Sequence, residues 1–95
     1  MKYWLTEPAK DDLLSIWDYT ADRWNEERAD LYIDALDARF AWLTKNVGLW
    51  KPRPELGQGV CSYLEQSHVI MFWERRDGIE ILRVLHGRMD VQQHL

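Results

Sequence analysis

The hydrophobic pattern of the chain changes period once, and this change limits the folds that the chain can adopt. Between residues 9 and 43, apolar side chains recur at steps of three and four, which is typical of amphipathic helices. After residue 59 they alternate at every second residue, which is typical of strands. A loop with Pro52, Pro54, Gly57 and Gly59 separates the two parts. The pattern predicts an α+β domain in which helices precede most of a sheet.

Two helices are expected in the first half of the chain. The first is predicted over about Pro8–Arg23, with Thr6 as its N-cap. The second is predicted over about Glu26–Asn46, with Asn25 as its N-cap and Gly48 as its C-cap. Because the break between the two segments is so short, they are expected to form an antiparallel helical hairpin.

Four strands are expected around the helices. The first is Lys2–Thr6, and the others are Val60–Glu65, His68–Glu74 and Ile79–His86, with a tight turn at Asp77–Gly78 before the last. The predicted order is therefore β-α-α-β-β-β. We expect a two-layer domain in which the helical hairpin packs on an antiparallel sheet, with the first strand at one edge. No repeat or linker interrupts the pattern, so residues 1–95 are expected to form a single domain.

Composition and charge restrict the classes of function. The formal net charge is −4 and no run of five basic residues occurs, so direct binding of nucleic acid is not expected. The longest apolar run, Val69–Trp73, is far shorter than the roughly 20 residues that span a bilayer. The single cysteine, Cys61, cannot form an intrachain disulfide, and the N-terminus lacks the features of a signal peptide. We therefore expect a cytoplasmic protein with no membrane contact.

Four stretches of the chain are similar to a known family of bacterial proteins. They are AKDDLLSIWDYTADRW, ADLYIDAL, SHVIMFW and IEILRVLHGRMDVQQHL. In this order they resemble two helices, the central strand, and the last strand with the tail of the ParE toxins, in the ParE/RelE superfamily of type II toxin–antitoxin modules. The resemblance implies a RelE/ParE-like fold and neutralisation by a ParD-like antitoxin. It also implies inhibition of DNA gyrase by binding rather than by catalysis, without a cofactor.

Ribosome-dependent cleavage of messenger RNA, as in the RelE toxins, is the alternative function. Cleavage through the 2′-hydroxyl needs an acid, a base and cations that stabilise the charged phosphorane. Arg83 stands where such an arginine is expected, and His86 could act as acid or base. Only two cations, Lys51 and Arg53, lie in the long loop to stabilise such a charge, so nuclease activity is the less favoured hypothesis. The three histidines lack the spacing of metal ligands, so no metal site is expected.

The end of the chain is the candidate segment for inhibiting the target. Since the resemblance implies that the C-terminal segment acts on gyrase, the candidate residues are Arg83, His86, Arg88, Asp90 and His94. The alternative for Arg83 is a structural ion pair with Glu74 or Glu80 across or along the sheet. The alternative for the tail is a short docked end.

The second predicted helix carries two apolar stripes, although a helix that packs on one sheet needs only one. The core stripe is Ala29, Ile33, Leu36, Phe40 and Leu43, and the second stripe is Leu31, Ala35, Ala38 and Trp42. The second stripe could pack on the first helix, or it could form a groove for an antitoxin segment. Trp17 and Trp24 could contribute from the other side of the hairpin. The candidate antitoxin-binding residues are therefore Trp17, Trp24, Leu31, Ala35, Ala38 and Trp42.

Overall fold

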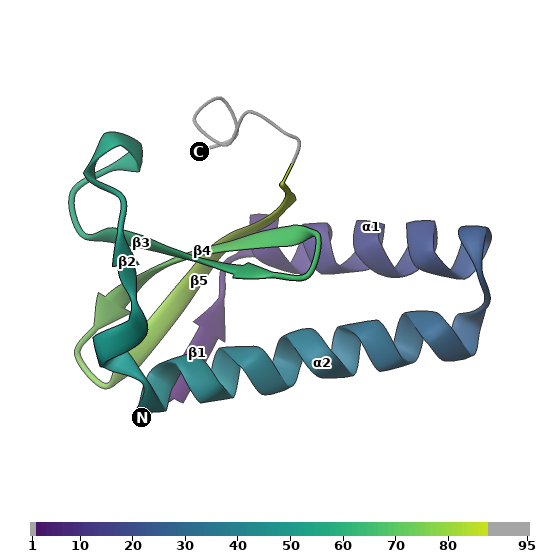
Figure 1. Cartoon of the computed structure of the whole chain (residues 1–95), viewed down its shortest axis with the longest axis horizontal. Coiled ribbons are helices and arrows are strands. Elements are labelled where there is room, and N and C mark those ends of the chain that lie inside the picture. Colours follow the sequence, from purple (N-terminus) through teal and green to yellow (C-terminus); the bar gives the residue numbers. More distant parts are fainter. Residues whose placement is uncertain (1, 88–95) are drawn as a thin grey trace.

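The computed structural model describes residues 2–87 and confirms the predicted order of helices and main strands (Figure 1). The first three elements are β1 (Lys2–Leu5), α1 (Glu7–Arg23) and α2 (Glu26–Lys45). The three long strands are β3 (Val60–Glu65), β4 (His68–Arg75) and β5 (Gly78–His86). Each of these elements begins and ends within about one residue of its predicted bounds, as expected from strong periodicity.

The loop between α2 and β3 contains short elements that the sequence did not predict. They are the 3₁₀ turns η1 (Val47–Leu49) and η2 (Pro54–Leu56), with the two-residue strand β2 (Lys51–Pro52) between them. The predicted C-cap at Gly48 was wrong, because α2 ends at Lys45 and its C-cap is Asn46, two residues before Gly48. Asn46 caps the helix, and its side-chain Nδ2 donates to the Trp42 carbonyl oxygen at 2.8 Å. Gly48 lies inside η1 instead.

Both predicted N-caps are confirmed. The Thr6 hydroxyl oxygen accepts from the Ala9 N–H at 3.1 Å, and the Asn25 Oδ1 accepts from the Arg28 N–H at 2.7 Å. Each bond satisfies an N–H group that has no partner inside the helix. Neither α1 nor α2 is long and apolar enough to cross a membrane, and no other helix within residues 2–87 is either.

The five strands form one sheet in the order β1-β5-β4-β3-β2. Neighbours from β2 through β5 are antiparallel, and for β3, β4 and β5 this confirms the prediction. The first strand corrects the expectation of a wholly antiparallel sheet, because β1 lies parallel to β5, from Lys2 opposite Gly78 to Leu5 opposite Ile81. Parallel pairing requires a long connection, and both helices and three strands lie between these two segments in the chain.

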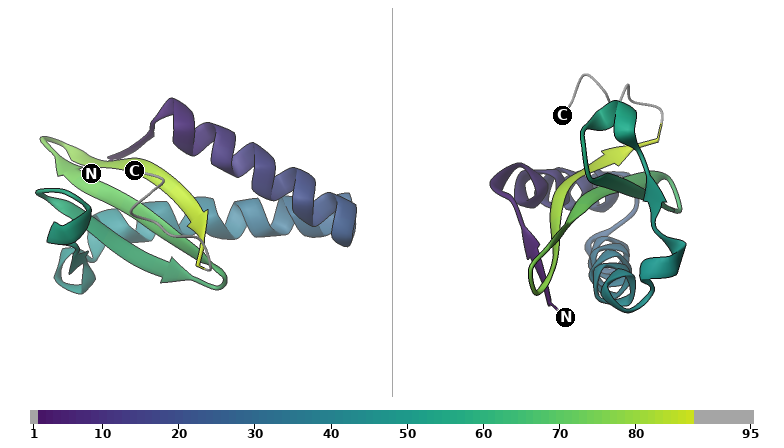
Figure 2. Two further views of the ribbon diagram at one scale, coloured as in Figure 1. Left: turned by 90° about the horizontal axis from the view of Figure 1, so that it is seen from above. Right: turned by 90° about the vertical axis from the view of Figure 1, so that its left-hand side faces the viewer.

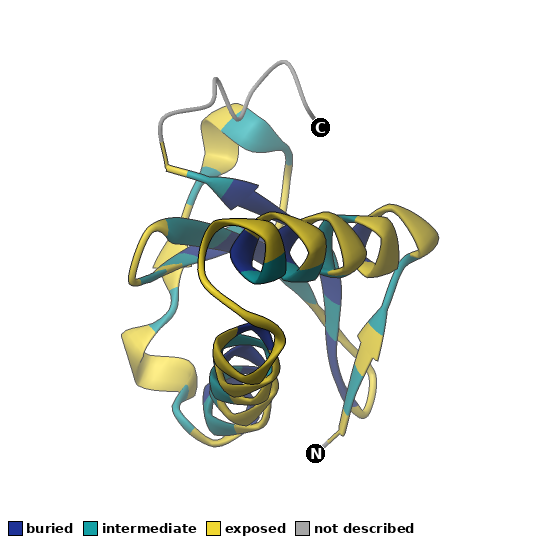
Figure 3. Ribbon diagram, turned by 90° about the vertical axis from the view of Figure 1, so that its right-hand side faces the viewer, coloured by how far each residue is buried: buried dark blue, intermediate teal, exposed yellow. Residues whose placement is uncertain are grey.

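The helical hairpin covers one face of this mixed sheet (Figure 2). Along α2 the predicted core stripe points inward, as Figure 3 shows, and all of it is buried except Ile33, which is half-buried. The core between the layers consists of Ala9, Ile16, Leu36, Phe40, Leu43, Ile70, Phe72, Ile79, Ile81 and Val84. The hairpin extends well beyond the β3–β4 turn in Figures 1 and 2, so its outer part has no sheet beneath it.

An irregularity in β5 explains how a charged residue fits inside an apolar strand. The pairing with β4 shifts by one residue, so that Leu82 is an extra residue between Ile81 and Arg83. Strict alternation after Ile81 would direct Arg83 into the core. Because of this β-bulge, the next core side chain is Val84 and Arg83 lies off the core face.

Candidate functional site

A groove of about 680 Å³ lies where the helical hairpin leaves the sheet, and we call it the hairpin groove. One wall comes from the end of α1 and the start of α2, and the other from the β3–β4 turn with His68 and His86. Three large side chains in it are unusually exposed: Tyr19 at 65%, Trp24 at 56% and Leu31 at 63%. Clustered apolar exposure of this kind is typical of a surface that binds another protein.

Cationic side chains surround the aromatic end of the hairpin groove. The Arg28 guanidinium lies 4.3 Å from the centre of the Trp24 ring, and the Arg23 guanidinium lies 5.9 Å from it. Such cation–π contacts attract the guanidinium groups to the face of the exposed indole. Glu27 is the acidic residue among the groove's described lining. The groove therefore offers an apolar surface with positive charge at one end.

Three polar rings cross from α2 to the end of β5 along the inner wall of the groove. The Tyr32 hydroxyl and His68 Nδ1 share a hydrogen bond of 2.5 Å, and the His68 and His86 ring centres are 5.5 Å apart. Burial lowers the pKa of His68, and the neighbouring His86 lowers it further. Burial also raises the pKa of Tyr32. Both shifts favour the neutral forms of Tyr32 and His68, so an uncharged hydrogen bond joins α2 to β4 at this wall.

The structure brings together three of the six predicted antitoxin-binding residues. Trp24, Leu31 and Ala35 all line the hairpin groove. Trp17 lies outside the lining, and its indole Nε1 donates to Asp30 Oδ1 at 2.8 Å, which ties α1 to α2. Ala38 is exposed on α2 away from the groove.

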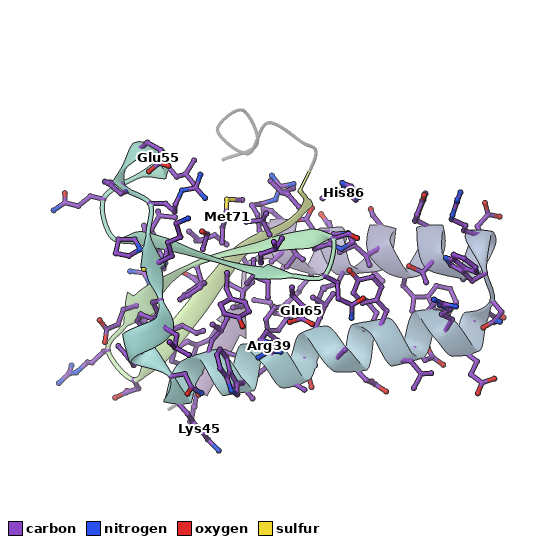
Figure 4. The ribbon with its side chains drawn as sticks, viewed as in Figure 1. Arg39, Lys45, Glu55, Glu65, Met71 and His86 are labelled. Carbon is purple, nitrogen blue, oxygen red and sulfur yellow. The ribbon has the colours of Figure 1, made fainter. Side chains whose placement is uncertain are left out.

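Trp42, the last member of the second stripe, packs on the sheet. Its ring centre is 5.3 Å from that of Tyr63, and the Arg39 guanidinium lies 4.6 Å above its ring. Figure 4 shows Arg39 of α2 and Glu65 of β3 on facing elements, and their Nε and Oε1 atoms are 2.7 Å apart. The second stripe therefore has two parts: its first half lines the groove, and its last residue secures α2 to β3.

Arg83 forms an ion pair inside the fold with a partner that the sequence did not indicate. The expected partners, Glu74 and Glu80, were wrong. Arg83 Nε donates to Asp12 Oδ2 at 2.8 Å, and Nη2 donates to Oδ1 at 2.9 Å. The same carboxylate accepts from the Val84 N–H at 3.0 Å. These bonds raise the pKa of the Arg83 guanidinium, which stays charged.

Asp12 completes the edge of the sheet beyond the end of β1. The pairing of β1 with β5 stops at Ile81. The Thr6 hydroxyl then donates to the Leu82 carbonyl oxygen at 2.9 Å, and Asp12 takes the N–H of Val84. A short strand, an N-cap and a helix carboxylate thus satisfy successive backbone groups along one edge.

His86 lies between the hairpin groove and a second cavity. This cavity, the sheet hollow, has a volume of about 610 Å³ and is lined by β2, β3, the β3–β4 turn and the end of β5. Just beyond His86, the Gly87 N–H donates to the Ser67 carbonyl oxygen at 2.8 Å. The other candidates for target inhibition, Arg88, Asp90 and His94, lie outside the described residues.

Sequence reasoning missed several residues of the hairpin groove. Tyr19 had a usable signal, because it is a large aromatic residue off the core stripe of α1. Arg28 and Tyr32 flank the second stripe of α2, and this position in the sequence was a weaker indication that they line the groove. His68 had none, since its position opposite His86 depends on the β-bulge in β5.

The chain is similar to toxins of known type along nearly its whole length. Residues 3–91 match the family described as ParE toxin of type II toxin-antitoxin system, parDE. Toxin ParE1 of Caulobacter vibrioides is 36% identical over 93 residues, which cover 98% of this chain and 96% of that protein. Toxin ParE1 of Mycobacterium tuberculosis is 32% identical over 95 residues, covering 99% and 97%.

A solved structure supports the fold independently of close sequence similarity. It is described as the chromosomal ParDE TA system from P. aeruginosa, and it superposes on this chain with a TM-score of 0.77. The match covers 90% of this chain and 95% of that one, at 24% identity. The likeness shows a shared two-layer architecture.

Proposed function

We propose, since this chain belongs to the ParE family of toxins from type II toxin–antitoxin systems, that a ParD-like antitoxin neutralises it by binding in the hairpin groove. The observation that carries the proposal is the joint exposure of Tyr19, Trp24 and Leu31 around one groove. Burying these side chains would supply the apolar contact on which most protein interfaces depend.

The groove favours an antitoxin segment with a defined pattern of side chains. A helix laid along it would present apolar residues at steps of three and four toward Leu31 and Ala35. Arg23 and Arg28, beside Trp24, would pair with an acidic residue at one end of that segment. Small Ala35 gives room for a large side chain of the partner.

Leu31→Glu is expected to weaken antitoxin binding at least about 100-fold, because it puts a charge into the apolar centre of the interface. Leu31 is 63% exposed, so the isolated toxin should keep its fold. The measurement is a titration of each purified variant with the ParD-like antitoxin, together with helical circular dichroism.

Leu14→Glu is the matched control for this substitution. Leu14 is 66% exposed on α1 and does not line the groove, so its replacement should leave the affinity within about threefold. Equal weakening by both substitutions, or unchanged affinity in Leu31→Glu, would place the interface elsewhere.

We further propose that the toxin inhibits DNA gyrase in the cytoplasm, and that it does so by binding rather than by catalysis. Membership of the ParE family supports this target class. The pairing of Arg83 with Asp12 supports a structural role for the arginine that a nuclease would use. His86, at the end of β5, then introduces the segment with Arg88, Asp90 and His94, which we propose contacts the target.

A further inference from the structure

Apolar side chains are buried on the outer face of the sheet, the face opposite the helical hairpin. Ile70 and Phe72 of β4 lie in the core, so alternation directs Met71 to the outer face, and Figure 4 shows it on the side away from α2. Leu85 follows the core residue Val84 in β5 and points the same way. Met71 and Leu85 are both buried, at 0% and 3% exposure. Such burial requires a layer of chain over the outer face.

The loop that carries β2 and η2 lies at the β3 side of the outer face. It rises on the side of the sheet away from α2 in Figure 1, and the Arg53 N–H donates to the Val60 carbonyl oxygen of β3 at 2.8 Å. In the order of the sheet, β5 is two strands away from β3, which is about 10 Å at the usual spacing of strands. Leu85 on β5 therefore needs cover from another segment.

Residues 88–95 begin in the right place to supply this cover. They follow β5 directly after Gly87, which lines the sheet hollow. Because the Gly87 N–H donates to the Ser67 carbonyl oxygen at 2.8 Å, the chain leaves β5 beside the β3–β4 turn. A segment of this length spans about 26 Å when extended, which exceeds the roughly 10 Å that separates β5 from β3. The segment can therefore cross the outer face.

The sequence of residues 88–95 alternates between polar and apolar side chains. The even positions are all polar: Arg88, Asp90, Gln92 and His94. The odd positions are apolar except for Gln93: Met89, Val91 and Leu95. Since successive side chains of an extended chain point to opposite sides, this pattern gives the segment one apolar side and one polar side. The apolar side is suited to a buried face, and the polar side is suited to water.

We propose that residues 88–95 dock on the outer face of the sheet as an extended segment, with their apolar odd positions against Met71 and Leu85. The occupant of this face is therefore the chain's own C-terminal segment. Docking leaves the even positions in solvent, and these include the three candidates for contact with the target. That last step alone rests on the proposed function: the sheet would hold the target-contacting side chains in one arrangement before the target binds.

The test is the rate at which hydrogen peroxide oxidises Met71 in purified toxin free of antitoxin, measured by mass spectrometry of its peptides. Oxidation of a thioether depends on its exposure, so Met71 should react slowly in the wild-type chain. Met89→Ser with Val91→Ser removes two apolar contacts of the docked segment and should speed the oxidation of Met71 at least about tenfold. Helical circular dichroism should stay unchanged, which shows that the rest of the fold is intact.

The matched control changes two even positions of the same segment. Asp90→Ser with Gln92→Ser should leave the oxidation rate of Met71 within about twofold of the wild-type rate. Equal acceleration in the two double variants, or acceleration in neither, would overturn the proposal. Protection of Met71 that falls when the toxin is diluted would also overturn it, because a second copy of the chain would then be the cover.

Nuclear magnetic resonance of the wild-type toxin gives a second readout that needs no substitution. Nuclear Overhauser effects are expected between the methyl groups of Val91 and those of Met71 or Leu85. If the assigned methyl groups showed no such effects, the segment would not be docked on this face. None of these measurements uses gyrase, so the docking can fail while the proposed target stands, and the proposed target can fail while the docking stands.

Discussion

Asp12→Ala is expected to lower the free energy of unfolding by about 2–3 kcal/mol, since it removes the carboxylate that accepts from the Arg83 guanidinium and from the Val84 N–H. The Arg83 and Asp12 side chains are 23% and 13% exposed. Solvent therefore screens the pair only partly, and the expected loss lies below that of a fully buried pair. Urea unfolding followed by circular dichroism measures the change.

Asp11→Ala is the control for this experiment. Asp11 precedes Asp12 in α1 and is exposed, so its replacement removes the same charge and should change stability by about 0.5 kcal/mol or less. Equal effects of the two substitutions would show that helix charge, rather than the contact with Arg83 and Val84, determines the result. The account of the sheet edge would then fail.

Gly78→Ala is expected to cost about 3 kcal/mol, because an added methyl group would overlap the backbone of β1. A Cβ at Gly78 would lie 1.8 Å from the Lys2 carbonyl oxygen and 2.7 Å from its carbonyl carbon. These are main-chain atoms of the paired strand, so a side-chain rotation cannot relieve the overlap. The four-residue strand β1 would have to move away from β5, and unfolding in urea should begin at a lower concentration.

Gly48→Ala provides the comparison for a glycine without such a neighbour. No atom lies within 4 Å of a Cβ built at Gly48, so its replacement should change stability by about 0.5 kcal/mol or less. Hydrogen exchange at Tyr3, Trp4 and Leu5 gives a local readout. If Gly78→Ala kept full protection there, the close approach of β1 would not be the reason for glycine at this position.

Gly78 was predicted as a turn residue, but the structure requires glycine at this position for a different reason. The Asp77–Gly78 pair correctly predicted a tight turn between β4 and β5. In the structure the turn residues are Arg76 and Asp77, and Gly78 is the first residue of β5. Glycine is required there by the neighbouring strand, which is distant in the chain and leaves no local signal.

The helices and long strands could be predicted because their patterns are local. The hydrophobic period and the capping residues Thr6 and Asn25 depend on near neighbours, and they placed each element to within about one residue. The parallel pairing of β1 and the ion pair between Asp12 and Arg83 depend on contacts between chain ends. Nothing near either residue in the sequence distinguishes that partner from Glu74 or Glu80.

The hairpin groove could be predicted in part, because the residues that α2 contributes to it follow a local helical pattern. The second stripe of α2 identified Leu31 and Ala35, since exposed apolar residues at helical spacing require a neighbour. Trp17 and Trp42 were predicted to bind the antitoxin for the same reason, because they are large apolar residues off the core stripes. In the structure, however, Trp17 contacts Asp30 and Trp42 contacts Tyr63. An indole can satisfy its N–H locally, so its presence alone does not indicate a binding surface.

The most direct test of the central proposal is a supercoiling assay of purified gyrase with this toxin freed from its antitoxin. The account predicts that the toxin abolishes supercoiling or traps cleaved DNA, and that adding the ParD-like antitoxin restores activity. Unchanged supercoiling at a large excess of folded toxin would contradict gyrase as the target, and cleavage of messenger RNA on translating ribosomes would then be the activity to measure.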